Sequence, residues 1–125
     1  MRDTSCAFCT SNEEIVFDHP LAFVIKDKFE VTKGHHLIIP KRHFANYFEL
    51  KSAELLAINS LIKQIRDKLL MEDTTIEGFN IGINQGVIAG QTIMHAHVHI
   101  IPRRKGDLSN PRGGIRNVIP GKGDY

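Results

Sequence analysis

Apolar residues form short runs in the first third of the chain, and each run has the composition of a β-strand. Two such runs lie at residues 15–17 and 21–25, joined by a turn at 18–20. A third run at 35–39 is ended by Pro40, because proline has no N–H to donate to a strand ladder. The pattern predicts three short strands.

The spacing of apolar residues changes to a helical period in the middle of the chain. Five residues recur at alternating steps of three and four and therefore share one face: Leu55, Ile58, Ile62, Ile65 and Leu69. This period predicts one long helix over 53–71, with Ser52 as its cap. Residues 44–49 are expected to form one short helical turn.

The second half of the chain returns to the strand pattern. Residues 79–84 alternate apolar and polar, and residues 95–101 form a last strand that Pro102 ends. Five short strands and one long helix predict an α+β domain, with a mainly antiparallel sheet because the strands come mostly without intervening helices. One helix cannot cover both sheet faces, so we expect a second copy of the chain to cover the other one, in a homodimer.

Length and charge bound the class of protein. The 125 residues fit a single domain, 1–125. No apolar run reaches the ~20 residues of a membrane helix, and residues 1–6 lack the apolar stretch of a secretory signal, so a cytoplasmic protein is expected.

Residues 103–125 carry a net charge of +4 and show no periodicity, which predicts an extended basic tail. This tail suits an anionic ligand or is simply solvated. Nothing predicts nucleic-acid binding, because no basic stripe is interleaved with aromatics.

Three of the seven histidines alternate in one β-like run, as His95, His97 and His99. On a strand, alternate side chains lie on the same face about 6.6 Å apart, so the three imidazoles are expected to line one surface. Such a row fits either a metal site or catalysis by a neutral imidazole nucleophile. In the second case the flanking histidines orient the nucleophile, donate to phosphate oxygens or protonate the leaving group.

The residues just before this row favour nucleophilic catalysis. Gly90 allows a ligand to approach the backbone closely, and Gln91 and Thr92 offer neutral donors to a phosphate. Asn84 ends the neighbouring predicted strand and offers another donor. The favoured hypothesis is therefore a phosphate-directed nucleophile, with His97 in the middle position.

The two cysteines, Cys6 and Cys9, have the spacing C-x-x-C. A structural disulfide is not expected in a cytosolic chain. The pair is then a redox motif, half of a metal site, or two thiols with neither role. A redox pair usually lies between a strand and a helix, and the N-terminal position of this pair counts against it.

The run at 91–101 resembles the signature of the histidine triad (HIT) family, His-φ-His-φ-His-φ-φ with φ apolar. The likeness extends to residues 34–43, which look like the family's strand and its Pro-Lys-x-His ending, and to 80–86, before the active-site loop. The segment 110–114 is similar to that of bacterial-type members.

The resemblance implies a homodimeric nucleotidyl hydrolase or transferase that needs no cofactor for its chemistry. His97 would attack the α-phosphorus of a nucleoside phosphoramidate or dinucleoside polyphosphate, form a covalent nucleotidyl-histidine, and be freed by water. His99, His95 and His35 would complete the catalytic cluster. The implied nucleotide-binding residues are Asp27, Asn84, Gln91, Thr92, Ile25 and Phe8.

The resemblance also implies a structural zinc ion. Some members hold zinc through two cysteines and two histidines, and the matching positions are Cys6, Cys9, His43 and His95. Two alternatives stay open from the sequence. One is a zinc-dependent hydrolase with all three triad histidines as ligands, and the other is a non-catalytic, regulatory nucleotide-binding protein.

Overall fold

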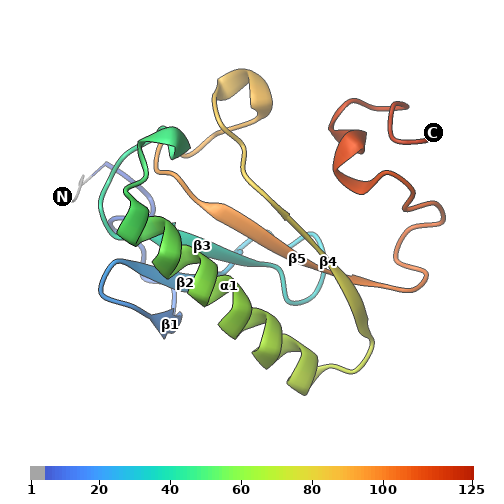
Figure 1. Cartoon of the computed structure of the whole chain (residues 1–125), viewed down its shortest axis with the longest axis horizontal. Helices are drawn as coiled ribbons and strands as arrows, with labels where there is room; N and C mark the ends of the chain where they lie inside the picture. Colours follow the sequence, from blue (N-terminus) through green and yellow to red (C-terminus); the bar gives the residue numbers. More distant parts are fainter. Residues whose placement is uncertain (1–4) are drawn as a thin grey trace.

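The computed structural model describes residues 5–125 and is built around one antiparallel sheet of five strands, in the order β1-β2-β3-β5-β4 (Figure 1). The strands are β1 (Ile15–Asp18), β2 (Ala22–Lys26), β3 (His36–Pro40), β4 (Ile76–Gly82) and β5 (Val98–Arg104). The helices are the long α1 (Ser52–Glu72) and the short 3-10 turns η1 (Tyr47–Glu49), η2 (Val87–Ala89) and η3 (Gly114–Val118). The predicted α+β class is confirmed. The part of the signal-peptide argument that concerns residues 1–4 lies outside the described residues.

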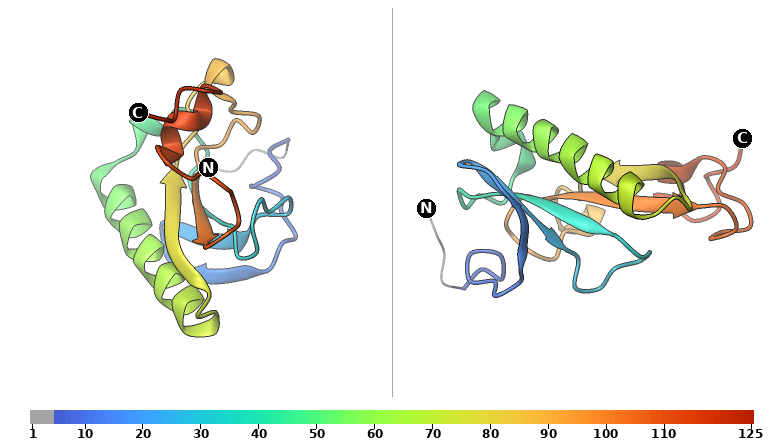
Figure 2. Two further views of the ribbon diagram at one scale, coloured as in Figure 1. Left: turned by 90° about the vertical axis from the view of Figure 1, so that its right-hand side faces the viewer. Right: turned by 90° about the horizontal axis from the view of Figure 1, so that it is seen from below.

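Helix α1 lies across one face of the sheet (Figure 2). Its buried apolar residues pack on Val24, Ile38 and Ile100, and they are Ala57, Ile58, Leu61, Ile65 and Leu69. The predicted face was therefore slightly rotated: Leu55 is 49% exposed, whereas Leu61 is buried. Among residues 5–125 no helix combines the length and the apolar character needed to cross a bilayer.

The start of α1 differs from the prediction because a buried ion pair sets it. Lys51, not Ser52, is the cap residue, and its N–H donates to the Glu54 carboxylate at 2.8 Å. The same carboxylate receives Arg42 Nε and Nη2 at 3.0 and 2.8 Å. Hydrogen bonding to Arg42 lowers the pKa of Glu54, so Glu54 stays ionised although it is buried. Arg42 thus ties the segment after β3 to the first turn of α1.

Strand β5 starts and ends later than the sequence predicted. His95 and His97 precede the strand, which begins at Val98, and Pro102 lies inside it. The pairing of β5 with β3 covers only Val98 to Ile100, so at Pro102 that side of β5 carries no ladder that a missing N–H would break. Pro102 still pairs with Phe79 of β4 on the other side.

The sheet face opposite α1 is covered in part by the chain's own N-terminal segment. Cys6, Phe8 and Cys9 are buried there against a second apolar cluster that includes Ile25 and Ile39. Figure 2 shows this segment and α1 on opposite sides of the sheet. The N-terminal segment therefore supplies part of the cover that was expected from a second copy of the chain, and the homodimer stays a prediction.

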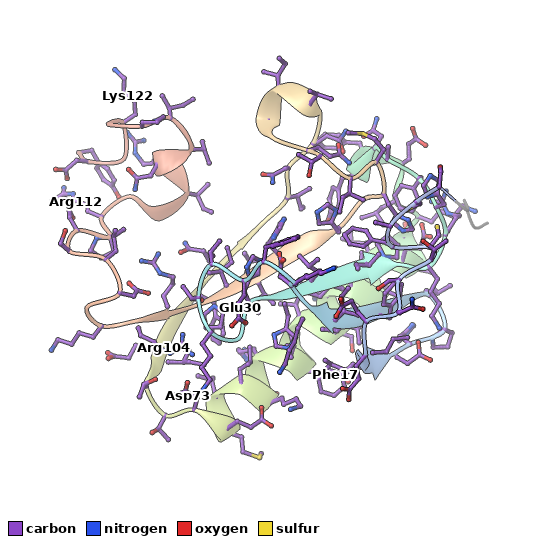
Figure 3. All side chains as sticks on the ribbon, turned by 180° about the vertical axis from the view of Figure 1, so that it is seen from behind. Phe17, Glu30, Asp73, Arg104, Arg112 and Lys122 are labelled. Atoms are coloured by element: carbon purple, nitrogen blue, oxygen red, sulfur yellow. The ribbon has the colours of Figure 1, made fainter. Side chains whose placement is uncertain are left out.

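The C-terminal segment is not simply an extended tail. It contains η3, which packs against β4, the edge strand of the sheet. Its positive charge is partly neutralised by ion pairs, since Arg103 pairs with Asp107 at 2.8 Å and Arg104 pairs with Asp73 at 2.9 Å. Arg104 and Asp73 are labelled in Figure 3. Ile115 of η3 approaches Gly82 at the end of β4.

Acid should destabilise the fold through His36, which lies on the α1 side of β3. Burial lowers the pKa of His36, with Lys26 and Lys68 acting in the same direction, while its Nδ1–H donates to the Gly34 carbonyl. A histidine pKa lowered by folding stabilises the protein fully above the unfolded value of about 6.5, and the contribution is lost as the pH falls below that value. We expect the free energy of unfolding to drop by up to about 1.4 kcal/mol per pH unit for this group.

Denaturant titrations of the wild type and of His36→Gln between pH 7.5 and 5 measure this effect. The glutamine amide can still donate to a carbonyl, so the variant should show a shallower pH slope. His19→Gln, in the turn between β1 and β2, is the matched control and should keep the wild-type slope. Equal pH slopes of the free energy of unfolding for all three proteins would contradict the destabilising role expected for His36 in acid.

Candidate active site and metal centre

A pocket of about 630 Å³ opens on the sheet face opposite α1, and His97 and His99 line it together with His35. This volume suits a small-molecule ligand. His35 directly precedes β3, and His99 is paired with Leu37 across the β3–β5 ladder. The sheet register therefore brings together histidines that are more than sixty residues apart in the sequence.

One hydrogen bond defines the tautomer of His97. Its Nδ1 lies 2.8 Å from the backbone oxygen of His95, and a carbonyl oxygen can only accept, so Nδ1 carries the proton. In the neutral ring, Nε2 then has a free lone pair. The ring is partly buried and lies at a centroid distance of 5.1 Å from His99 and 4.9 Å from Phe8.

A chain of hydrogen bonds next to His97 sets the tautomers of His35 and His99. The Val31 N–H donates to His35 Nδ1 at 3.2 Å, so the proton of neutral His35 is on Nε2. That nitrogen lies 2.9 Å from His99 Nδ1 and 3.3 Å from an Asp27 carboxylate oxygen. His99 Nδ1 is consequently an acceptor, and the His99 Nε2–H remains as a donor.

Burial keeps these imidazoles neutral near pH 7. Removal from water lowers the pKa values of His35 and His97, although the Asp27 carboxylate acts in the opposite direction on both. Burial, and then the neighbouring His97 and His35, lower the pKa of His99 to about 4. A neutral ring with a free nitrogen is the form that can act as a nucleophile.

Five of the six residues predicted to bind a nucleotide offer the pocket a surface or a polar group: Phe8, Ile25, Asp27, Asn84 and Thr92. Asn84 and Thr92 are exposed at its edge, while Ile25 is 3% exposed. One Asp27 oxygen accepts the Phe29 N–H at 2.8 Å. The carboxylate is thus held in place by its own loop.

Gln91 also borders the pocket, but its amide is engaged elsewhere. Its Oε1 accepts the Gly86 N–H at 2.9 Å, and its Nε2 donates to the carbonyls of Ala45 and Ile93 at 3.0 and 3.2 Å. The side chain is 4% exposed. The Gln91 side chain therefore stabilises the loop before the triad by hydrogen bonds, and its amide is not available as the phosphate donor expected from the sequence.

His95 faces a different site from its two neighbours. Its Nε2–H donates to the Pro40 carbonyl at 2.7 Å, which turns its Nδ1 lone pair toward the two cysteines. Nδ1 lies 3.4 Å from Cys6 Sγ, 3.6 Å from Cys9 Sγ and 3.2 Å from His43 Nδ1. Cys9 Sγ lies 3.4 Å from His43 Nδ1. The expectation that all three triad rings line one surface was wrong, because His95 precedes the regular part of β5.

These four side chains fit a tetrahedral metal ion. All four ligand atoms lie within 4.8 Å of one another. Zinc bonds of about 2.1 Å to nitrogen and 2.3 Å to sulfur place ligand atoms about 3.4 to 3.8 Å apart at tetrahedral angles, close to the distances observed. Burial lowers the pKa of His95, which favours the neutral ligand form, and the Pro40 carbonyl orients the ring as an outer-shell partner does.

The geometry contradicts a zinc ion held by all three triad histidines, since His95 lies in the cysteine cluster and His97 and His99 line the pocket. Asp27, His35 and His99 also bring three ligand atoms together. However, the Val31 N–H fixes the proton on His35 Nε2, the atom that would have to bind the ion. Hydrogen bonds therefore explain why Asp27, His35 and His99 lie close together, without a metal ion.

No pattern in the sequence marks the backbone groups that set the tautomers. The carbonyls of His95 and Pro40 and the N–H of Val31 decide which nitrogen of each ring carries a proton. Every residue has such groups, so only the fold reveals which of them meet a histidine. The Gln85 side chain, which accepts the Tyr47 N–H, was missed for the same reason.

The model of the HIT domain matches residues 10–106. The chain belongs to the HIT family. A HIT-like protein of Methanocaldococcus jannaschii is 37% identical over 122 residues, covering 90% of this chain and 91% of its own. The structure of a HIT family protein from Bacillus anthracis matches with a TM-score of 0.77 at 33% identity, covering 86% of this chain and 78% of that one.

Some HIT relatives are named as hydrolases, and one neighbour holds zinc. Adenylylsulfatase HINT3 of Arabidopsis thaliana is 34% identical over 74% of this chain and 46% of its own length. The asymmetrical bis(5'-nucleosyl)-tetraphosphatase of Schizosaccharomyces pombe is 38% identical over 63% of this chain and 43% of its own. A zinc-bound HIT family protein from Mycobacterium smegmatis matches with a TM-score of 0.76 at 29% identity, over 85% of this chain and 80% of that one.

Proposed function

We propose that this HIT protein hydrolyses nucleotidyl phosphate bonds through a covalent intermediate on His97. One observation carries the proposal: the His95 carbonyl holds the proton of His97 on Nδ1, which leaves the Nε2 lone pair available in a pocket of nucleotide size. The two hydrolase relatives are named for substrates that contain a nucleoside 5'-phosphoryl group, and this supports the same bond as the target here.

The reaction proceeds in two displacements. His97 Nε2 attacks the α-phosphorus, the bond from phosphorus to the leaving group breaks, and the leaving group departs with the electron pair. The remaining Nε2–H of His99 donates to the α-phosphate as charge develops. Water then attacks phosphorus, the phosphorus–nitrogen bond breaks, and the electron pair returns to His97 while the mononucleotide leaves.

The residues around the histidines bind and orient the nucleotide. Asp27 lies beside His35 and His99 and is the acceptor for ribose hydroxyls. Ile25 and Phe8 supply apolar surface for the base, and Asn84 and Thr92 offer donors at the pocket edge. Nucleoside phosphoramidates and dinucleoside polyphosphates both present an α-phosphate to this arrangement.

Mass spectrometry of enzyme quenched during turnover tests the proposal directly. Incubation with an adenosine phosphoramidate or a dinucleoside tetraphosphate should give a protein mass increased by one nucleotidyl group, and peptide mapping should place that group on His97. Tight mononucleotide binding with neither adduct nor product would instead indicate a non-catalytic nucleotide-binding protein.

The four side chains Cys6, Cys9, His43 and His95 are proposed to hold a structural zinc ion. Their donor set of two thiols and two imidazoles is typical of closed zinc sites, which keep no open position for a substrate. When bound there, zinc cross-links the N-terminal segment to the segments after β3 and before β5. It supplies no step of the hydrolysis.

We also propose that the chain forms a homodimer through the exposed edge of the sheet. Strand β4 is an outer strand, and Ile81 and Ile83 at its end are 46% and 38% exposed. An apolar strand edge of this kind is a template for pairing with a second copy. Sedimentation equilibrium should give twice the chain mass, and Ile81→Lys should shift the equilibrium toward the monomer. A wild-type monomer at micromolar concentration would contradict the dimer.

A further inference from the structure

Two of the contacts to the ring of His97 come from the region of the cysteine cluster. The His95 carbonyl accepts the His97 Nδ1–H at 2.8 Å, and His95 is itself one of the four cluster residues. The Phe8 ring packs edge-on against the His97 ring at a centroid distance of 4.9 Å and an interplanar angle of 75°. Phe8 lies between Cys6 and Cys9 in the sequence.

The backbone at His95 is positioned by side-chain and loop contacts. Strand β5 begins at Val98, so the His95 carbonyl lies outside the regular ladder. The Ala96 N–H donates to Phe44 O at 2.7 Å, and His95 Nε2–H donates to Pro40 O at 2.7 Å. The opposite edge of the His95 ring faces the two sulfurs and His43. The Ala96 N–H belongs to the same peptide group as the His95 carbonyl, and its acceptor Phe44 directly follows the cluster residue His43. The direction of the carbonyl therefore depends on this bond and on how the His95 ring is held.

The position of Phe8 depends on the same cluster. Residues 5–14 form turns and bends, with neither helix nor strand among them. Both flanking cysteines direct their sulfurs to the cluster, where Cys6 Sγ contacts His95 and Cys9 Sγ contacts His43 and His95. Phe8 also contacts the His95 ring, at a centroid distance of 5.9 Å.

We propose that the metal cluster positions the nucleophile in addition to stabilising the fold. With an ion bound, the cluster fixes the His95 ring and the two cysteines on either side of Phe8 in the sequence, Cys6 and Cys9. The carbonyl and the aromatic ring that orient His97 are then fixed as well. This inference rests on the proposed role of His97 and adds that occupancy of the metal site sets the rate of its reaction with phosphorus.

Metal removal should therefore affect turnover more than binding. Loss of partners that orient a reacting group typically costs 10- to 100-fold, and we expect kcat to fall by about that factor. The affinity for a mononucleotide should fall by a smaller factor than kcat, because Asp27, His35 and His99 are held by β2, β3, β5 and the loop bond to Val31, and only the apolar surface of Phe8 is displaced. A purely structural ion would leave kcat unchanged wherever the metal-free protein is folded.

The experiment compares zinc-loaded protein, protein stripped by a chelator, and stripped protein reloaded with zinc. All are assayed at a temperature where circular dichroism shows the stripped protein to be folded. Long-range ¹H–¹⁵N spectra of the histidine rings give a readout independent of activity. His97 should show one Nδ1–H tautomer in loaded protein and a mixture of tautomers or exchange broadening in stripped protein.

Phe8→Leu removes the aromatic contact to His97 and leaves all four metal-binding side chains unchanged. It should retain zinc and melt close to the wild type, yet lower kcat at least fivefold. Phe23→Leu is the matched control, because Phe23 packs against the same apolar cluster but does not line the histidine pocket. Its kcat should be that of the wild type.

An unchanged His97 spectrum together with an unchanged kcat after zinc removal would overturn the inference. If the stripped protein is unfolded at every temperature, Phe8→Leu with full zinc content and wild-type kcat would overturn it. Failure of the proposed function looks different, since zinc-loaded protein would then form no nucleotidyl adduct. In that case the tautomer spectra still decide whether the metal site orients His97.

Discussion

His97→Asn should lower kcat by about 10⁴-fold or more while the protein still binds a mononucleotide. Asparagine has no nitrogen lone pair to attack phosphorus, and removal of a catalytic nucleophile costs factors of this size. Its amide N–H can still donate to the His95 carbonyl, which receives His97 Nδ1–H at 2.8 Å in the wild type. The polar partner therefore stays satisfied, and the fold should be retained.

Steady-state kinetics with a dinucleoside tetraphosphate, together with equilibrium binding of a mononucleotide, measure the two effects separately. His19→Asn is the control, because His19 lies in the turn between β1 and β2, away from the pocket-lining residues. Its activity should equal that of the wild type. Residual hydrolysis by folded His97→Asn at more than about one tenth of the wild-type rate would refute the assigned nucleophile.

Removal of zinc should produce the largest change in stability. An ion present at a thousand times its dissociation constant stabilises the folded state by about 4 kcal/mol, and for a chain of this length that corresponds to about 15 °C in Tm. The protein purified without chelator should contain one zinc ion per chain. After chelation, calorimetry should show the lower Tm, and added zinc should restore it.

Cys6→Ser and Cys9→Ser should reproduce the loss of both zinc and stability, because each removes a thiolate ligand. Burial raises the pKa of the Cys6 thiol in the metal-free site, so zinc binding there releases a proton. Ser11→Ala is a control in the same segment, outside the four-residue cluster. A zinc content near zero in untreated protein would dismiss the metal site.

The local pattern was enough to locate most elements but not their ends. The helical period at 53–71 and the β-rich runs predicted α1 and all five strands, because apolar periodicity reflects which side of an element is buried. Pro102 was expected to end β5 and instead lies within it. A proline ends a strand only where its missing N–H faces a partner, and the register of β3 against β5 decides that.

The candidate site, like the fold, was predicted only in part from the sequence. The alternating histidines pointed to His97, and the resemblance to the HIT family named the four residues that the fold gathers into one cluster. The sequence did not reveal that the His95 side chain lies in a different site from those of His97 and His99. Strict alternation implies one surface only on a regular strand, and β5 begins at Val98, after His95 and His97.

The sequence by itself determined the fold class, the family and the residue types of the chemistry, because periodicity and side-chain identity are written along the chain. Tertiary structure alone decided which nitrogen of each histidine in the two sites carries a proton, that the Gln91 amide is bound within its own loop region, and that one residue, His95, joins the cysteine cluster to His97. These features depend on backbone carbonyls and N–H groups, which are the same in every residue and acquire a role only through what the fold places beside them.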